Sequence, residues 1–72
     1  MFTEIRKLVE AEPFMPFTIH LADGNQLRVP TLDDIALMPS GGRIIVFGED
    51  VRWDIDPSFM VKRVSVDQAP SA

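Results

Sequence analysis

The chain has 72 residues, which is enough for one domain, and its seven basic and eleven acidic side chains give a net charge of −4. The absence of cysteine excludes disulfides and thiolate zinc sites, and a single histidine argues against a metal site built from protein ligands alone. Because nucleic-acid binders need Lys and Arg for phosphate contacts, the acidic balance also argues against that class of function.

Small size limits the stability that this chain can gain from its own core. A domain of this length buries only about 60% of the surface of its unfolded chain. Such domains usually gain stability from disulfides, a metal or a partner subunit, and only the last of these is left here. No segment has the apolar length of a signal peptide core or a membrane span, so we expect a cytoplasmic protein without a membrane partner.

The first predicted element is a short helix over residues 3–11. Its apolar stripe consists of Phe2, Ile5, Leu8 and Val9. Thr3 is expected to cap the helix, and Pro13 ends it because the residue before a proline is pushed toward extended geometry. Since so short a helix is marginal on its own in water, its apolar stripe must pack against the rest of the chain.

A β-hairpin is predicted over residues 17–29, where apolar and polar residues alternate on both sides of an Asp-Gly dipeptide. A two-residue turn would pair Ile19 with Arg28 and so mix the two faces. A three-residue loop at residues 22–24 instead pairs Ile19 with Leu27, with the glycine in a left-handed conformation. The alternation therefore favours the three-residue loop.

The remaining elements make the chain mainly β. They are predicted at residues 31–34 (helical turn), 35–38, 43–47 and 51–55 (strands), 57–60 (helical turn) and 61–66 (strand). Five or six short antiparallel strands after one helix predict a single small SH3-like or Sm-like barrel over residues 1–67. The alternative is an open antiparallel meander with the helix on one face. Residues 68–72 are expected to form a frayed tail.

The strand at residues 43–47 is apolar on both faces, because it contains the run Ile-Ile-Val-Phe. The strand that follows it has one apolar face. A connecting loop with an even number of residues joins Ile44 and Val46 to that face. A loop with an odd number joins Ile45 and Phe47 instead. In both cases one apolar pair points to the other side, where the helix, the curvature of a barrel or a second copy of the chain must cover it.

Residues 13–24 read Pro-Phe-Met-Pro-Phe-Thr-Ile-His-Leu-Ala-Asp-Gly and follow the predicted helix. With the pattern Pro-Phe-x-Pro-Phe-x-Ile-His-Leu-Ala-Asp-Gly, residues 1 to about 66 resemble a set of small uncharacterised bacterial proteins, and the resemblance implies no activity. The order of helix and Asp-Gly hairpin also resembles the Sm family of RNA-binding rings. The chain departs from the Sm pattern at residues 30–34, which lack the Sm glycine and RNA-contacting loop, and at Arg43, which follows a glycine rather than preceding one.

The strand that is apolar on both faces provides the first candidate contact residues. Phe47, Trp53 and Phe59 are most simply interpreted as core. An apolar pair on the second face would instead form an exposed patch of the kind that marks an interface. On this reasoning Ile45, Phe47 and Trp53 are predicted to bind a protein partner.

The polar face of the predicted hairpin provides two more candidates, His20 and Arg28. The near-neutral pKa of imidazole suits a pH-sensitive contact, and the simpler interpretation is a solvated face or a hydrogen bond between His20 and Gln26. The sequence places no nucleophile or acid beside His20, so no catalytic residue is assigned. We expect neither an enzyme nor a bound cofactor or metal.

The sequence therefore predicts a non-enzymatic binding or assembly module. It would form a homo-oligomer or bind a larger protein through strand 43–47 and its neighbours, either by strand addition or by contact between sheet faces. The alternative is an Sm-like RNA-binding ring that depends on Arg28, Arg43 or Lys62.

Overall fold

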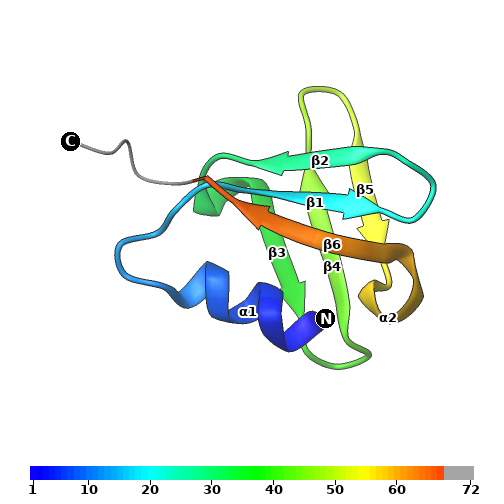
Figure 1. The fold of residues 1–72 in the computed structure, drawn as a ribbon, viewed down its shortest axis with the longest axis horizontal. Coiled ribbons are helices and arrows are strands. Elements are labelled where there is room, and N and C mark those ends of the chain that lie inside the picture. Colours follow the sequence, from blue (N-terminus) through cyan, green and yellow to red (C-terminus); the bar gives the residue numbers. More distant parts are fainter. Residues whose placement is uncertain (68–72) are drawn as a thin grey trace.

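The computed structural model describes residues 1–67. Its elements are α1 (Phe2–Glu10), β1 (Phe17–Leu21), β2 (Gln26–Val29), the 3-10 turn η1 (Leu32–Asp34), β3 (Ile35–Met38), β4 (Arg43–Phe47), β5 (Arg52–Ile55), α2 (Pro57–Met60) and β6 (Val61–Val66). The strands form two antiparallel sheets, sheet A with the order β2-β1-β6 and sheet B with the order β3-β4-β5. In Figure 1 the strands of sheet A run across those of sheet B.

The predicted class is confirmed, with one N-terminal helix followed by six antiparallel strands. Within residues 1–67 no ladder joins sheet A to sheet B, so no closed barrel is found there. This arrangement is consistent with the open-meander alternative. The tail predicted at residues 68–72 lies outside the described residues.

The core lies between the two sheets. Its buried side chains are Ile5 from α1, Phe17, Ile19, Leu21, Leu27 and Val29 from sheet A, and Ile35, Ile44, Val46 and Ile55 from sheet B. In both sheets these residues alternate with residues of the outer face, as the period of two in a strand requires. A strand of either sheet therefore has one face in the core and one outer face.

Helix α1 packs its apolar stripe against this core and lies beneath β6 in the view of Figure 1. It begins one residue earlier than predicted, at Phe2 with Met1 as its N-cap, and no side chain bonds to its first N–H groups. The predicted capping role of Thr3 is therefore wrong, because Thr3 already lies in the first helical turn. The helix ends before Pro13 as expected, with Ala11 in an extended conformation.

The β1–β2 hairpin has the register predicted for a three-residue loop, while residues 22–25 lie between the two strands because β2 begins only at Gln26. Ile19 is paired with Leu27, and the N–H of Leu21 donates to the carbonyl of Asn25 at 2.8 Å. Gly24 has φ of 96°, a conformation that glycine adopts without the steric cost of a side chain. The face-matching argument from the sequence is confirmed.

The connection between β4 and β5 has an even number of residues, 48–51, and is closed by a hydrogen bond from the N–H of Gly48 to the carbonyl of Val51. Ile44 is consequently paired with Ile55 and faces the core. The other apolar pair of β4, Ile45 and Phe47, lies on the outer face of sheet B.

No helix in the described part of the chain combines the length and the apolar composition that a membrane span requires.

Candidate functional site

The structure separates the five predicted contact residues into three places. Ile45 and Phe47 lie on the outer face of sheet B. Trp53 lies on the opposite side of the same sheet, paired with Val46. His20 and Arg28 lie on the outer face of sheet A. The five residues therefore cannot form one continuous contact surface.

The outer face of sheet B is the more apolar of the two outer faces. It is formed by Ala36 and Met38 of β3, Arg43, Ile45 and Phe47 of β4, and Arg52 and Asp54 of β5. Met38 is 44% exposed and Phe47 40% exposed, while Ile45 between them is half-buried. Large apolar side chains thus reach the surface together on one sheet face, which is typical of an interface.

One ion pair crosses this apolar face. The guanidinium of Arg43 donates from Nε to Oδ1 of Asp54 at 2.8 Å, and its Nη2 lies 2.8 Å from the same oxygen. The two side chains are 42% and 55% exposed, so solvent limits the contribution of the pair to stability to about 0–1 kcal/mol. The carboxylate is placed between two arginines, since Arg52 lies two residues away on the same face.

The strand order limits how a partner can approach β4. Both edges of β4 are occupied, by β3 on one side and β5 on the other. Addition of a foreign strand to residues 43–47 is therefore blocked, and within sheet B only the short outer strands β3 and β5 have an edge that no other described strand occupies. A partner that contacts Ile45 and Phe47 must approach the sheet face.

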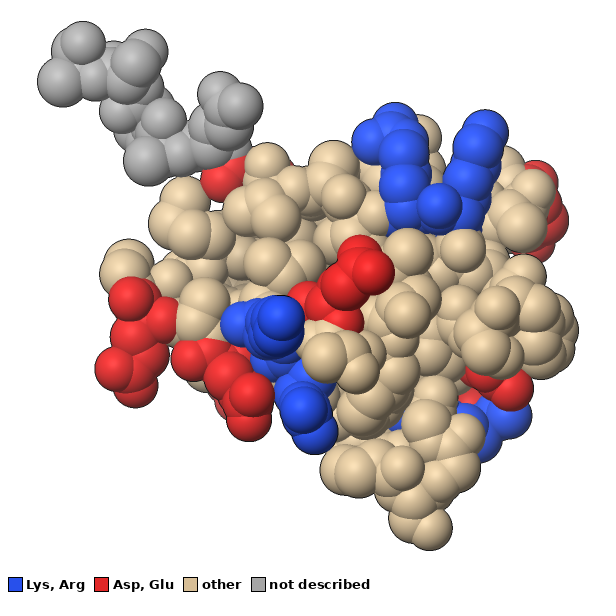
Figure 2. Space-filling view, turned by 60° about the horizontal axis from the view of Figure 1, so that its bottom comes forward, with Lys and Arg blue, Asp and Glu red and all other residues tan. Residues whose placement is uncertain are grey.

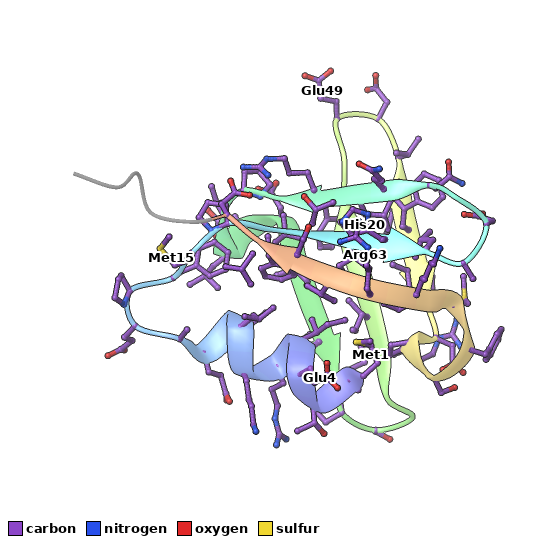
Figure 3. The ribbon with its side chains drawn as sticks, in the orientation of Figure 1. Met1, Glu4, Met15, His20, Glu49 and Arg63 are labelled. Atoms are coloured by element: carbon purple, nitrogen blue, oxygen red, sulfur yellow. The ribbon has the colours of Figure 1, made fainter. Side chains whose placement is uncertain are left out.

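The β4–β5 hairpin extends past sheet A at the upper end of Figure 1, and Figure 3 shows Glu49 at this end. Near this end Val51 is 57% exposed, and Trp53 is 36% exposed although its pairing with Val46 places it on the core side of sheet B. The prediction that Phe47, Trp53 and Phe59 are core residues is wrong. Phe59, on the single helical turn α2, is 72% exposed.

The outer face of sheet A is polar and bonded within the chain. Nε2 of His20 lies 2.8 Å from Oγ of Ser65 on β6, rather than bonding to Gln26, the paired residue on β2. Figure 3 shows His20 beside Arg63, its paired residue on the other side. The sequence did not reveal Ser65 as a partner, because β6 is 45 residues away from His20 and its register is interrupted by a bulge.

A hydroxyl bonded to an imidazole is one component of a serine hydrolase site, which also needs a group that orients the imidazole and a cleft for substrate. Within residues 1–67 the one hydrogen bond made by the His20 side chain is that to Ser65. The two cavities described below are lined by other residues. We therefore interpret the His20–Ser65 hydrogen bond as a structural link between β1 and β6.

Arg28 is also used to connect strands. Its guanidinium donates to both carboxylate oxygens of Asp67, just beyond β6, and its Nη1 lies 3.5 Å from Oγ1 of Thr18. The hydrogen bond with Asp67, followed by the attraction between the opposite charges, raises the pKa of Arg28. The same partner, first by hydrogen bonding, lowers the pKa of Asp67 below its ordinary value. The bidentate pair ties β2 to the end of β6 across the sheet.

Two cavities lie on the surface, both at chain turns. One has a volume of about 150 Å³ and is lined by Leu21, Ala22, Asp23, Phe59 and Met60, between the β1–β2 loop and α2. The other has a volume of about 290 Å³ and is lined by Met1, Phe2, Thr3, Gly41, Gly42, Asp56, Pro57 and Ser58. Asp56 in this second cavity already accepts from the N–H and hydroxyl of Ser58 as the cap of α2.

The described residues contain no group of three or more His, Asp or Glu side chains that could hold a metal ion. Figure 2 shows basic side chains in separate groups, interspersed with acidic ones, on the face that it presents. Of the three residues named for RNA contact, Arg28 and Arg43 each pair with a carboxylate. The RNA-binding alternative therefore stays a prediction, and no observation in residues 1–67 favours it.

Comparison with known proteins gives no relative from which a site could be transferred: no family model, no curated protein and no solved structure matches the chain. The resemblance of residues 13–24 to small bacterial proteins stays an expectation, and the candidate site rests on the geometry of the outer face of sheet B.

Proposed function

We propose that the chain is a non-enzymatic, cytoplasmic assembly module that binds a second copy of itself through the outer face of sheet B. The observation that carries the proposal is the joint exposure of Phe47 and Met38 around Ile45, on a sheet face that meets water in a single copy. The small β-rich fold suits such a module, and the resemblance of residues 13–24 to small bacterial proteins supports a bacterial origin.

The free energy of burial gives this association a driving force. Covering apolar surface contributes about 25 cal/mol for each Å² removed from water. The chain has no cysteine with which to stabilise its small core, so burial in an interface is the largest contribution still open to it. A partner surface of the same kind would cover Phe47 and Met38 together.

The surroundings of the apolar residues also suit contact between two identical faces. Arg43, Arg52 and Asp54 supply both signs of charge at the side of the apolar residues. A face that carries both signs can be complementary to itself, whereas a face of one sign would repel its copy. These three residues sum to +1, so the acidic excess of the chain lies outside this face.

Light scattering coupled to size-exclusion chromatography tests the proposal. We expect the wild-type chain to have the mass of a dimer at micromolar concentration. Phe47→Asp places a charge in the apolar contact and should raise the dissociation constant at least about 30-fold, the effect of a residue that contributes 2 kcal/mol to binding.

Phe59→Asp is the matched control, since Phe59 is more exposed than Phe47 and lies on α2 rather than on sheet B. This variant should keep the mass of the wild type. Circular dichroism verifies that both variants are folded. A folded wild-type monomer at these concentrations, or equal weakening by both substitutions, would refute the proposal.

A further inference from the structure

The two ladders of sheet B determine how the side chains of its outer face are arranged. Ile45 lies at the centre, because it is paired with Ala36 of β3 on one side and with Asp54 of β5 on the other. Along β4, Arg43 and Phe47 precede and follow Ile45 on the same face. Ile45 thus has four different neighbours on this face: a small apolar residue on β3, an acidic one on β5, and a basic and a large aromatic residue along β4 itself.

Two further residues complete the arrangement at opposite corners. Met38 is paired with Arg43, and Arg52 is paired with Phe47. The line from Met38 to Arg52 therefore runs diagonally across the face and passes through Ile45.

When two copies pack with these faces together, their two-fold axis lies between the two sheets and passes over Ile45. The direction of this axis decides which residue of the second copy each residue meets, and every contact is reciprocal. An axis along the strands would place Arg43 against Arg43 of the second copy. An axis at right angles to the strands would place Asp54 against Asp54 of the second copy. Both arrangements bring like charges into a contact that excludes water, which is strongly unfavourable.

Of the two diagonal axes, the one along the line from Met38 to Arg52 would set Arg43 against Ala36 of the second copy and Phe47 against its Asp54. The other diagonal axis passes between Arg43 and Asp54 on one side of Ile45 and between Phe47 and Ala36 on the other, and it avoids both conflicts. It places Arg43 against Asp54 of the second copy and, by reciprocity, Asp54 against Arg43. It also places Phe47 against Ala36 of the second copy, so that a large side chain meets a small one, as close packing of a core requires. The strands of the two copies then cross at about 90°, which is one of the two preferred ways in which sheets pack.

We propose, on the basis of the self-association proposed above, that the second copy packs in this crossed arrangement and that Arg43 and Asp54 exchange partners between the copies. The exposed Arg43–Asp54 ion pair within each copy is thereby replaced by two ion pairs between the copies, each joining Arg43 of one copy to Asp54 of the other. These two pairs set the orientation of the dimer. Ile45 and Phe47 supply the apolar contact, and Met38 lies against Arg52 of the second copy.

Charge reversal tests the exchange of partners. Arg43→Asp leaves two acidic residues at these positions of each copy, and Asp54→Arg leaves two basic ones. Each variant alone should dissociate with a constant at least about 30-fold above that of the wild type, because its homodimer contains only like-charge contacts. A one-to-one mixture should form a heterodimer, in which both contacts are complementary, with an affinity within about tenfold of the wild type.

Arg28→Asp and Asp67→Arg are the matched controls, since they reverse the charges of the ion pair on the outer face of sheet A. Each should remain a dimer without its counterpart. If the wild type is a dimer but the mixture of Arg43→Asp and Asp54→Arg forms no heterodimer, the crossed arrangement is wrong while self-association stands. A monomeric wild type would instead remove the proposed function itself.

Chemical cross-linking provides a measurement that is independent of the charges. Because the chain has no cysteine, single cysteines can be introduced without side reactions. A thiol cross-linker that spans about 10 Å, the distance between stacked sheets, should join Phe47→Cys to Ala36→Cys in a mixture of the two variants. Phe47→Cys alone should give little cross-linked dimer, and the opposite result would refute the diagonal axis.

Discussion

The outer faces of the two sheets differ in how their side chains are used. On sheet A, His20 is bonded to Ser65 and Arg28 to Asp67, so that polar groups connect the strands of one copy. On sheet B, Ile45 and Phe47 occupy the corresponding outward positions and have no polar group to satisfy. The polar side chains of the first face find hydrogen-bond partners within the same chain, whereas the second face leaves apolar side chains in contact with water.

This difference separates the apolar residues that the fold needs for its core from those on an outer face, which the fold does not need. A strand at the surface of a two-sheet core needs one apolar face and can have a polar face toward water. Burial alternates along both β1 and β4, but the outward residues of β1 are the polar Thr18 and His20, whereas Ile45 and Phe47 on β4 are apolar. Since exposed apolar sheet faces favour aggregation, we interpret the second apolar face of β4 as a contact surface.

The largest expected effect comes from two neighbouring isoleucines of β4 that face in opposite directions. Ile44 is fully buried, and Ile44→Ala should lower the free energy of unfolding by about 2–5 kcal/mol, a large part of what so small a domain has. Ile45→Ala on the outer face should lower it by less than about 1 kcal/mol in a single copy. Urea unfolding measures both values.

These measurements are best made in the Phe47→Asp background, where association does not contribute to the free energy of unfolding. A loss at Ile45 as large as that at Ile44 would mean that both faces of β4 are needed by the isolated fold. The contrast between the two sheets would then have no bearing on function.

A smaller effect is expected on the outer face of sheet A. Ser65→Ala removes the partner of His20 and should lower the free energy of unfolding by about 1 kcal/mol, the net value of a hydrogen bond. The mass measured by light scattering should stay that of the wild type. Ser40→Ala, at an exposed position between β3 and β4, is the control and should change neither quantity. A change of mass in Ser65→Ala would show that sheet A also takes part in association.

The smallest expected effect is on how the stability of the fold changes at low pH. The pKa of Asp67 is lowered in the folded chain by its hydrogen bond with Arg28, from an ordinary value of 3.8. A carboxylate with a depressed pKa stabilises the fold above its unfolded pKa, and this contribution is lost as the pH falls through the folded pKa. Asp67→Asn should therefore be slightly less stable than the wild type at neutral pH. The difference in Tm should shrink when the pH is lowered from about 5 to about 2.

A difference in Tm that stays constant over this range would mean that Asp67 does not act through its charge. Asp56→Asn probes the second carboxylate with a lowered pKa, which results mainly from its hydrogen bond with the Ser58 hydroxyl at the cap of α2. Because Asp56 does not belong to sheet A, it separates acid sensitivity of the helix cap from that of the sheet.

The sequence predicts most of the strands because their alternation is local information. The hairpin register follows from requiring Ile19 and Leu27 to share a face, and the structure has that pairing. The strand at residues 43–47 is also found at its predicted bounds. Its orientation was left open because four consecutive apolar residues satisfy either face, and the even loop then decides that Ile45 points outward.

What the sequence could not provide depends on how far one sheet covers the other. Trp53 has the residue type and the position of a core residue, yet the hairpin that contains it extends past sheet A. The partnership of His20 with Ser65 likewise depends on the pairing of β1 with β6, which no local pattern specifies. Of the candidate site, the residues of β4 were predicted, and the separation of His20 and Arg28 from them was not.

The position of Trp53 has a practical consequence for fluorescence measurements. The chain contains one tryptophan and no tyrosine, so excitation of the indole reports on a single place. Trp53 lies on sheet B but on the side opposite to Ile45 and Phe47. Its emission will therefore follow the melting of the hairpin and change little when two copies separate, which allows one optical signal to distinguish unfolding from dissociation.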